Sequence, residues 1–271
     1  MEFVELEPGP ALRGLARFWR LTGPSPTGEP RFEPVLPDGR VELIFHLGDP
    51  FEIESDGRRA LQPRALLAGQ GTAPVRLAPT GRIDVVGVRL EAGVAAGVVD
   101  ARLEELTDRI VELGAVACDF ARGLAEELQD PGRGQRWNDV LERRLARVLA
   151  RPRSARPRAL EHVVARVRAS GGRVPIAELA SQAGLSTRQL ERHFRERVGL
   201  GPKTFARLVR FQRALALLRC PGSSLAGIAA RCGYFDQAHL VRDFRRFAGA
   251  SPSRLRAAEH DLGAHFVDGA S

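Results

Sequence analysis

The stretch "GYFDQAHLVRDFRRFAGASP" (Gly233–Pro252) decides how the second half of this chain folds. Leu240, Phe244 and Phe247 recur at intervals of four and three residues, which is the spacing of one face of an α-helix. The arginines between them, such as Arg242, fall on the other faces. The stretch therefore predicts an amphipathic helix with an apolar back and a basic front.

A second copy of this pattern lies earlier in the chain, in "AGLSTRQLERHFRERVGLGP" (183–202). Before the turn, the two copies align with an offset of 49 residues, which pairs Gly184 with Gly233. After the turn the offset is 50, which pairs Phe194 with Phe244. Because apolar and basic positions both repeat, the chain contains one supersecondary unit twice.

Each copy is predicted to form a helix, a tight turn at a glycine and a second helix. Ser186 and Asp236 are the expected N-cap residues of the two second helices, and Gln189 completes a capping box with Ser186. Short helices with a packed back, a sharp turn and a basic outer face have helix-turn-helix geometry. In that geometry the second helix enters the major groove of DNA.

A helix is also expected between the copies, over Thr204–Arg219, because Phe205, Leu208 and Leu215 follow helical spacing. A helix of this length spans about 24 Å. We expect it to act as a rod that holds the two recognition helices about one DNA turn apart, roughly 34 Å. One chain would then read two successive faces of the major groove.

The segment from about Leu160 to Ala257 resembles the DNA-binding domain of AraC/XylS-type bacterial regulators. The chain departs from that family at Leu240 and Leu255, where Phe and Tyr are usual, and both changes keep an apolar side chain. The resemblance implies a sequence-specific transcriptional regulator, with no enzymatic activity and no cofactor. It is carried by these residues: Gly233, Tyr234, Asp236, His239, Arg242, Phe244, Gly249, Ser251 and Pro252.

The same resemblance implies which side chains contact DNA. Arginine suits guanine, glutamine suits adenine, and glutamate accepts from cytosine, whereas Ala238 offers only apolar contact, so the second unit is expected to discriminate less. Phosphate contacts are expected from Arg195, Arg210, Arg245 and the amides at helix N-termini. Base-reading roles fall to Arg188, Glu191 and Arg192 in the first unit, and to Gln237, Ala238, His239 and Arg242 in the second.

Charge divides the chain in the same place. Residues 1–150 carry a net charge of −5 and residues 151–271 carry +13, which together give +8. A compositional preference for arginine over lysine does not explain this segregation, so the second half is expected to bind a polyanion. We predict a first domain over 1–150, a linker over 151–158, a DNA-binding domain over 159–258 and a tail over 259–271.

The front domain is predicted to be rich in β-structure, with strands over about 12–90 and helices over about 92–150. Segments such as "VELIFHL" (Val41–Leu47) and "RIDVVGVRL" (Arg82–Leu90) are separated by turn signals at intervals typical of a barrel or sandwich. This part resembles an uncharacterised N-terminal domain of many AraC-type regulators, similar in layout to cupin-like sensor barrels. The expected fold class is therefore two-domain α+β: a cupin-like β-barrel domain with trailing helices, then an all-α double helix-turn-helix domain.

Two roles stay open for the front domain: binding a small effector inside the barrel, or forming a homodimer through the helices near Asp119–Ala150. A metal-dependent cupin enzyme would need several histidines, and the first 150 residues hold only His46, so no metal site is expected. Asp38 and Asp49 are expected to be turn residues. The other alternative is an architectural protein that binds DNA of any sequence.

Cys118, Cys220 and Cys232 are odd in number and widely spaced, which favours reduced thiols in a cytoplasmic protein. The N-terminus has no signal-peptide pattern, and no apolar run is long enough to cross a membrane. We therefore expect a cytoplasmic regulator whose partners are double-stranded DNA, a small-molecule effector, a second copy of the chain and, if it activates transcription, RNA polymerase.

Overall fold

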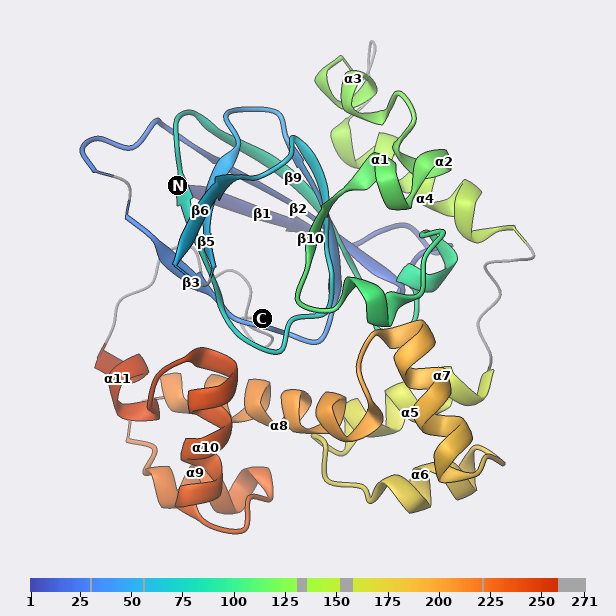
Figure 1. Ribbon diagram of the computed structural model, residues 1–271, viewed down its shortest axis with the longest axis vertical. Helices are drawn as coiled ribbons and strands as arrows, with labels where there is room; N and C mark the ends of the chain where they lie inside the picture. Colours follow the sequence, from blue (N-terminus) through green and yellow to red (C-terminus); the bar gives the residue numbers. More distant parts are fainter. Residues whose placement is uncertain (30, 56, 131–135, 152–157, 221, 258–271) are drawn as a thin grey trace.

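The computed structural model shows two halves that differ in secondary structure, a β-rich N-terminal half above and a helical C-terminal half below (Figure 1). Its description covers residues 1–29, 31–55, 57–130, 136–151, 158–220 and 222–257.

The strands of the N-terminal half form two antiparallel sheets that face each other. In spatial order, the described part of the six-stranded sheet consists of β1 (Glu2–Leu6), β2 (Ala16–Gly23), β9 (Ile83–Leu90), β4 (Val41–His46), β7 (Ala65–Ala68) and β10 (Ile110–Glu112). The four-stranded sheet consists of β3 (Glu33–Val35), β8 (Val75–Pro79), β5 (Phe51–Ser55) and β6 (Arg58–Leu61).

Along the strands of the larger sheet, alternate side chains face two different environments. In β4, Val41, Leu43 and Phe45 are buried in a core shared with the helices that follow the sheet. The alternate residues, Glu42, Ile44 and His46, face the space between the two sheets. The sheet therefore has a helix-covered outer face and an inner face that lines a cavity.

The helices after the strands cover that outer face (Figure 1). Phe120, Leu141 and Leu145 pack there against Phe18 and Val88 of the sheet. The elements are η1 (Ala95–Gly97), η2 (Leu103–Leu106), α1 (Leu113–Val116), α2 (Cys118–Ala121), α3 (Leu124–Gln129) and α4 (Trp137–Leu149).

Two strands lie outside the predicted interval of about 12–90. β1 is an edge strand with charged residues at Glu2 and Glu5, so it lacks the apolar alternation that marks a buried strand. β10 has only three residues and interrupts the predicted helical region. The first three α-helices there, α1, α2 and α3, have only four to six residues each, and Gly123, with φ +65°, separates α2 from α3.

The C-terminal half is all-helical and packs around α8 (Pro202–Arg219) (Figure 1). The Phe211 ring of α8 lies 5.0 Å from Phe244 and 5.4 Å from Phe247, while Phe205 lies 5.8 Å from Phe194. The remaining elements are α5 (Arg158–Ala169), α6 (Ile176–Gln182), α7 (Thr187–Val198), α9 (Leu225–Cys232), α10 (Gln237–Ala248) and α11 (Pro252–Ala257).

The expected fold class is confirmed: a β-rich domain with trailing helices precedes an all-helical domain with two helix-turn-helix units. The predicted rod over Thr204–Arg219 is α8, which begins two residues earlier because Pro202 is favoured at the first helical position. Most of the predicted linker (152–157) and all of the predicted tail (259–271) lie outside the described residues. None of the described helices combines the length and the apolar character needed to span a membrane.

Candidate nucleic-acid interface and internal cavity

The two helix-turn-helix units, α6–α7 and α9–α10, lie at opposite ends of α8 (Figure 1). Each turn passes through a glycine in the left-handed region, Gly184 at φ +66° and Gly233 at φ +74°. A residue with a Cβ is strained in this conformation, which explains why glycine stands at the same place in both copies.

Side-chain caps fix the start of each recognition helix. Ser186 Oγ accepts a hydrogen bond from the Gln189 amide at 3.2 Å, and Gln189 Oε1 accepts from the Ser186 amide at 2.9 Å. Asp236 Oδ1 accepts from the His239 amide at 2.6 Å. These bonds satisfy free amides at the N-termini of α7 and α10 and so define the first turn of each helix.

The back of each recognition helix is fully buried. Phe194 and Phe244 occupy the centre of the two apolar stripes. The front carries the side chains expected to contact DNA. Of these, Arg188, Arg192, Arg195, Gln237, Ala238, Arg242 and Arg245 are exposed, and Glu191, His239 and Arg210 are partly exposed.

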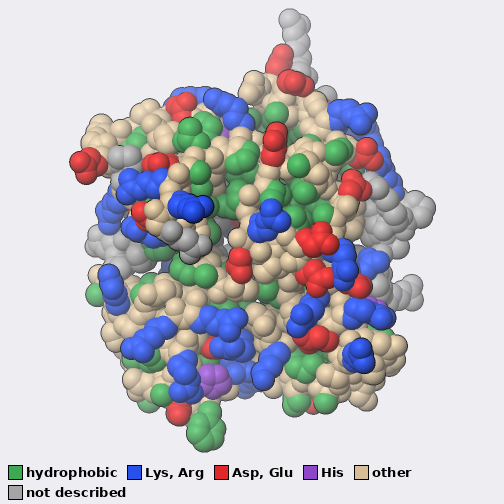
Figure 2. All heavy atoms as spheres, in the orientation of Figure 1, with side chains coloured by type: hydrophobic (Ala, Val, Ile, Leu, Met, Phe, Trp, Pro, Cys, Tyr) green, Lys and Arg blue, Asp and Glu red, His purple; other side chains and the backbone are tan. Residues whose placement is uncertain are grey.

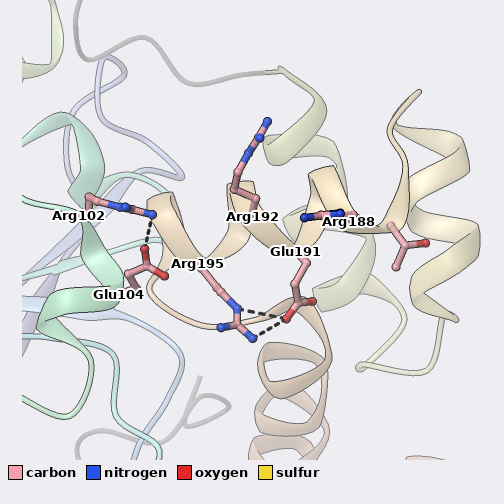
Figure 3. A pocket seen from close by; sticks show the side chains of 7 residues that line it. Arg102, Glu104, Arg188, Glu191, Arg192 and Arg195 are labelled. Carbon is pink, nitrogen blue, oxygen red and sulfur yellow. Dashed lines mark hydrogen bonds and ion pairs between the residues drawn. The ribbon is translucent and has the colours of Figure 1, made fainter.

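Within α7, the side chains of Arg188 and Arg192 extend from the helix surface without an ion pair to any described residue (Figure 3). Arg195 differs, because its guanidinium lies 3.2 Å from the carboxylate of Glu191, one helical turn away. Glu191 and Arg195 therefore restrain each other, while Arg188 and Arg192 keep their full donor capacity.

Within α10, His239 is held from behind by an aromatic contact. Its ring meets the edge of Tyr234 at 5.1 Å between ring centroids. Tyr234 itself is buried, and this burial raises the pKa of its hydroxyl, so the hydroxyl stays protonated. The contact packs one side of the imidazole against Tyr234, while His239 stays partly exposed.

Arg210 is placed differently from the other two phosphate candidates. Its guanidinium donates to the Gly172 carbonyl at 2.7 Å and lies 5.4 Å from the centroid of the Tyr234 ring. A phosphate would have to share this guanidinium with contacts inside the domain. Sequence reasoning missed this structural role because nothing in the sequence pairs Arg210 with a residue of the α5–α6 turn.

Two more features were not found from the sequence. Asp243 lies on the buried side of α10 and pairs with Arg207 of α8 at 2.6 Å. Phe235, directly before the N-cap of α10, is 94% exposed. A large apolar side chain in full solvent contact commonly marks an interaction surface.

Basic and acidic side chains are distributed unevenly over the surface. Figure 2 shows Lys and Arg side chains gathered over the C-terminal half, and acidic side chains where the two halves meet near α7. The recognition helices therefore present a positive surface suited to a phosphate backbone.

A cavity of about 920 Å³ lies in the N-terminal half, lined by residues of both sheets. Its walls are mostly apolar and include several polar groups. The apolar lining includes Trp19, Leu21, Ile44, Phe51, Ile53, Leu77 and Val85, and the polar lining includes Asp38, Arg40, Glu42, His46 and Gln62.

His46 is the buried titratable ring of this cavity. Its Nε2 lies 3.1 Å from Gln62 Oε1, which can only accept, so Nε2 carries the proton and Nδ1 is an acceptor. Nδ1 is buried with no hydrogen-bond partner in the described structure. Burial lowers the pKa of His46 to about 4, so the ring is neutral at pH 7. The described residues hold no group of three or more side chains suited to a metal ion.

The segment Leu36–Arg40 belongs to the cavity wall and to the contact between the halves. The Pro37 carbonyl accepts from Gln212 of α8, and the Gly39 carbonyl accepts from Gln70 at 3.0 Å. Asp38 Oδ1 accepts from the Arg40 amide at 2.9 Å, so it has the turn role expected of it, and it also forms ion pairs with Arg40 and Arg89.

An ion-pair chain continues from this segment into the helical half. Arg40 lies 2.8 Å from Glu91, and the same carboxylate lies 3.1 Å from Arg168 of α5. The cavity wall is thus connected to α8 by a buried hydrogen bond and to α5 by partly buried ion pairs. Sequence reasoning could not find them, because the partners are far apart in the chain and lie in different halves.

Residues 179–258 match the family described as a helix-turn-helix domain, and residues 4–112 match a domain of unknown function (DUF6597). The chain is 39% identical over 79 residues to the HTH-type transcriptional activator RhaS of Klebsiella pneumoniae (strain 342), an alignment that covers 29% of this chain and 28% of that protein. It is 35% identical over 89 residues to the HTH-type transcriptional regulator Rv1931c of Mycobacterium tuberculosis, with 33% and 34% covered.

The chain therefore spans about a third or less of the length of these curated relatives. Among solved structures, it is similar to a transcriptional regulator of Chromobacterium violaceum, described as an AraC-type DNA-binding domain-containing protein. That alignment has 28% identity and a TM-score of 0.35, and it covers 37% of this chain and 90% of the other.

Proposed function

We propose that this chain is a transcriptional regulator of the AraC type, which acts by binding one specific sequence of double-stranded DNA. The observation that carries this proposal is the pair of capped, basic recognition helices at the two ends of α8. With 18 residues, α8 is about 27 Å long. The recognition helices at its two ends can therefore enter successive major grooves. Binding to bacterial DNA implies a cytoplasmic location.

In this proposal the exposed side chains of each recognition helix read bases. Arg188 and Arg192 supply bidentate donors for guanine, and Gln237 suits adenine. Arg195 and Arg245 contact phosphates, as does Arg210 with the donors that its internal contacts leave over. Glu191, Ala238, His239 and Arg242 complete the reading surface.

Selection from a pool of randomised duplexes tests the proposal, followed by gel-shift titration of the enriched duplex. We expect a defined sequence to emerge, and we expect Arg192→Ala and Arg242→Ala to lose affinity and sequence preference. Arg13→Ala, an exposed arginine of the turn before β2, is the matched control and should bind as the parent does. An architectural binder would instead enrich no sequence, and any competitor duplex would displace it equally.

We further propose that the cavity between the sheets binds a small effector. Its size and largely apolar lining are those of a small-molecule site. The buried acceptor His46 Nδ1 calls for a hydrogen-bond donor on the ligand, since burial without a partner costs about 1–3 kcal/mol. Burial also raises the pKa of Glu42 in the same wall, against the opposing charge of Arg89.

Thermal melting with a library of small apolar molecules that carry one donor tests the effector site. A ligand that raises the melting temperature of the parent, but not of His46→Phe, supports it. A library without any stabilising member favours the other role of this half, homodimerisation through the helices near Asp119–Ala150. If the protein is an activator, RNA polymerase is the further partner. We propose no enzymatic activity.

A further inference from the structure

A cleft of about 680 Å³ runs along the reading face of α7, and its second wall comes from the N-terminal half. Arg188, Arg192 and Arg195 line it from α7 (Figure 3). Arg102 and Glu104, at and within η2, line it from the other side. A ligand that fills this cleft therefore also contacts Arg102.

The position of Arg102 is fixed by contacts between η2 and the C-terminal end of α7. Thr107 Oγ1 donates to the Gly199 carbonyl at 2.6 Å. Gly199 has φ +93°, and a Cβ there would lie 3.1 Å from the Leu103 carbonyl oxygen, so the two elements are in close contact. The Arg102 guanidinium also lies 3.5 Å from Glu196 of α7.

A recognition helix fills the groove that it enters. The major groove of DNA is about 12 Å wide, and a helix with its side chains is about 10–12 Å across. An element packed beside such a helix therefore lies at the rim of the groove, where the phosphates are. Arg102 has this position, and its side chain is 58% exposed.

We propose that Arg102 binds a DNA phosphate beside the groove entered by α7, so that the N-terminal half contributes directly to the DNA interface. This inference rests on the proposed DNA-binding function. The Glu104 carboxylate pairs with Arg102 and orients it (Figure 3). The same carboxylate makes no ion pair with an α7 arginine among the described residues. This argues against the alternative that Glu104 covers the reading face and keeps DNA away from it.

Full-length Arg102→Ala tests this contact on two probes of equal length, the duplex selected by the parent and a mixed-sequence duplex. We expect roughly fivefold weaker binding to both and an unchanged ratio between them, because a phosphate contact carries no sequence information. The slope of log affinity against log salt should fall by about 1. Arg102→Lys should keep the slope.

A second variant distinguishes a direct phosphate contact of Arg102 from an effect on the packing of the two halves. Glu196→Gln removes the ion pair between the halves but keeps the charge of Arg102, so we expect undiminished affinity. Weakening by Glu196→Gln as large as that by Arg102→Ala, or an unchanged salt slope in Arg102→Ala, overturns the proposal. Tighter binding by Arg102→Ala also overturns it. Failure of the parent to enrich any sequence would instead refute sequence-specific binding, while the mixed-sequence duplex still tests Arg102.

Discussion

The carboxylate of Asp243 has no solvent exposure and accepts from the Arg207 guanidinium at 2.6 Å, which ties the second recognition helix to the connecting helix α8. Arg207 is 27% exposed, so the two partners differ in their access to water. The pair fixes α10 against α8 from the side opposite its reading face. The orientation of the second reading face therefore depends on a charge that DNA does not touch.

Arg207→Ala should lower the free energy of unfolding by about 3 kcal/mol, because it leaves a buried carboxylate without its counter-charge. Asp243→Asn should cost less, since the remaining Arg207 can hydrate. Urea unfolding of both variants measures the difference. Equal losses, or a loss below about 1 kcal/mol for Arg207→Ala, would contradict the role given to this pair.

Removing either N-cap should destabilise the chain by about 1 kcal/mol, because the amides capped by Ser186 and Asp236 would lose their acceptors. Ser186→Ala and Asp236→Ala can be compared with Ser181→Ala, an exposed serine within α6 that caps nothing. Urea midpoints that move no further in the cap variants than in Ser181→Ala would show that the caps are dispensable.

Acid should destabilise the N-terminal half through His46. Its pKa is lowered from 6.5 to about 4 by burial, so between these pH values the unfolded chain binds the extra proton. Stability should therefore fall as the pH is lowered from 6.5 toward 4, by at most about 1.4 kcal/mol per pH unit.

His46→Gln provides the comparison, because it removes the titrating ring while every carboxylate titrates as before. Melting temperatures of both proteins at pH 7, 6 and 5 should converge as the pH falls, since only the parent loses the histidine contribution. Parallel curves would mean that His46 does not stay neutral inside the cavity.

Gly39 should not tolerate a side chain. It has φ +80°, and a Cβ would lie 3.2 Å from the Phe205 ring of α8. Gly14 has φ +73° but open space around it. Gly14→Ala therefore measures the cost of the left-handed conformation alone, about 1–2 kcal/mol. Gly39→Ala should cost about 1 kcal/mol more by urea unfolding. Equal costs would show that the contact between Gly39 and α8 is loose.

The duplicated unit could be predicted from sequence because its signals are local: apolar spacing, a glycine turn and a capping residue within about twenty residues. Asp243 could not, since a charged residue in an amphipathic helix is expected to face solvent. The contact of Pro37 with Gln212 and the place of Arg102 beside α7 depend on how the two halves pack, and no periodicity encodes that. β1 was missed because its charged edge lacks a strand pattern.

Hydroxyl-radical footprinting of the full-length protein on its selected duplex tests most directly whether α7 and α10 read DNA together. We expect two protected tracts on one side of the duplex, about 10 base pairs apart. Arg192→Ala should lose one tract and Arg242→Ala the other. A single tract, or two tracts that both survive each substitution, would contradict the account.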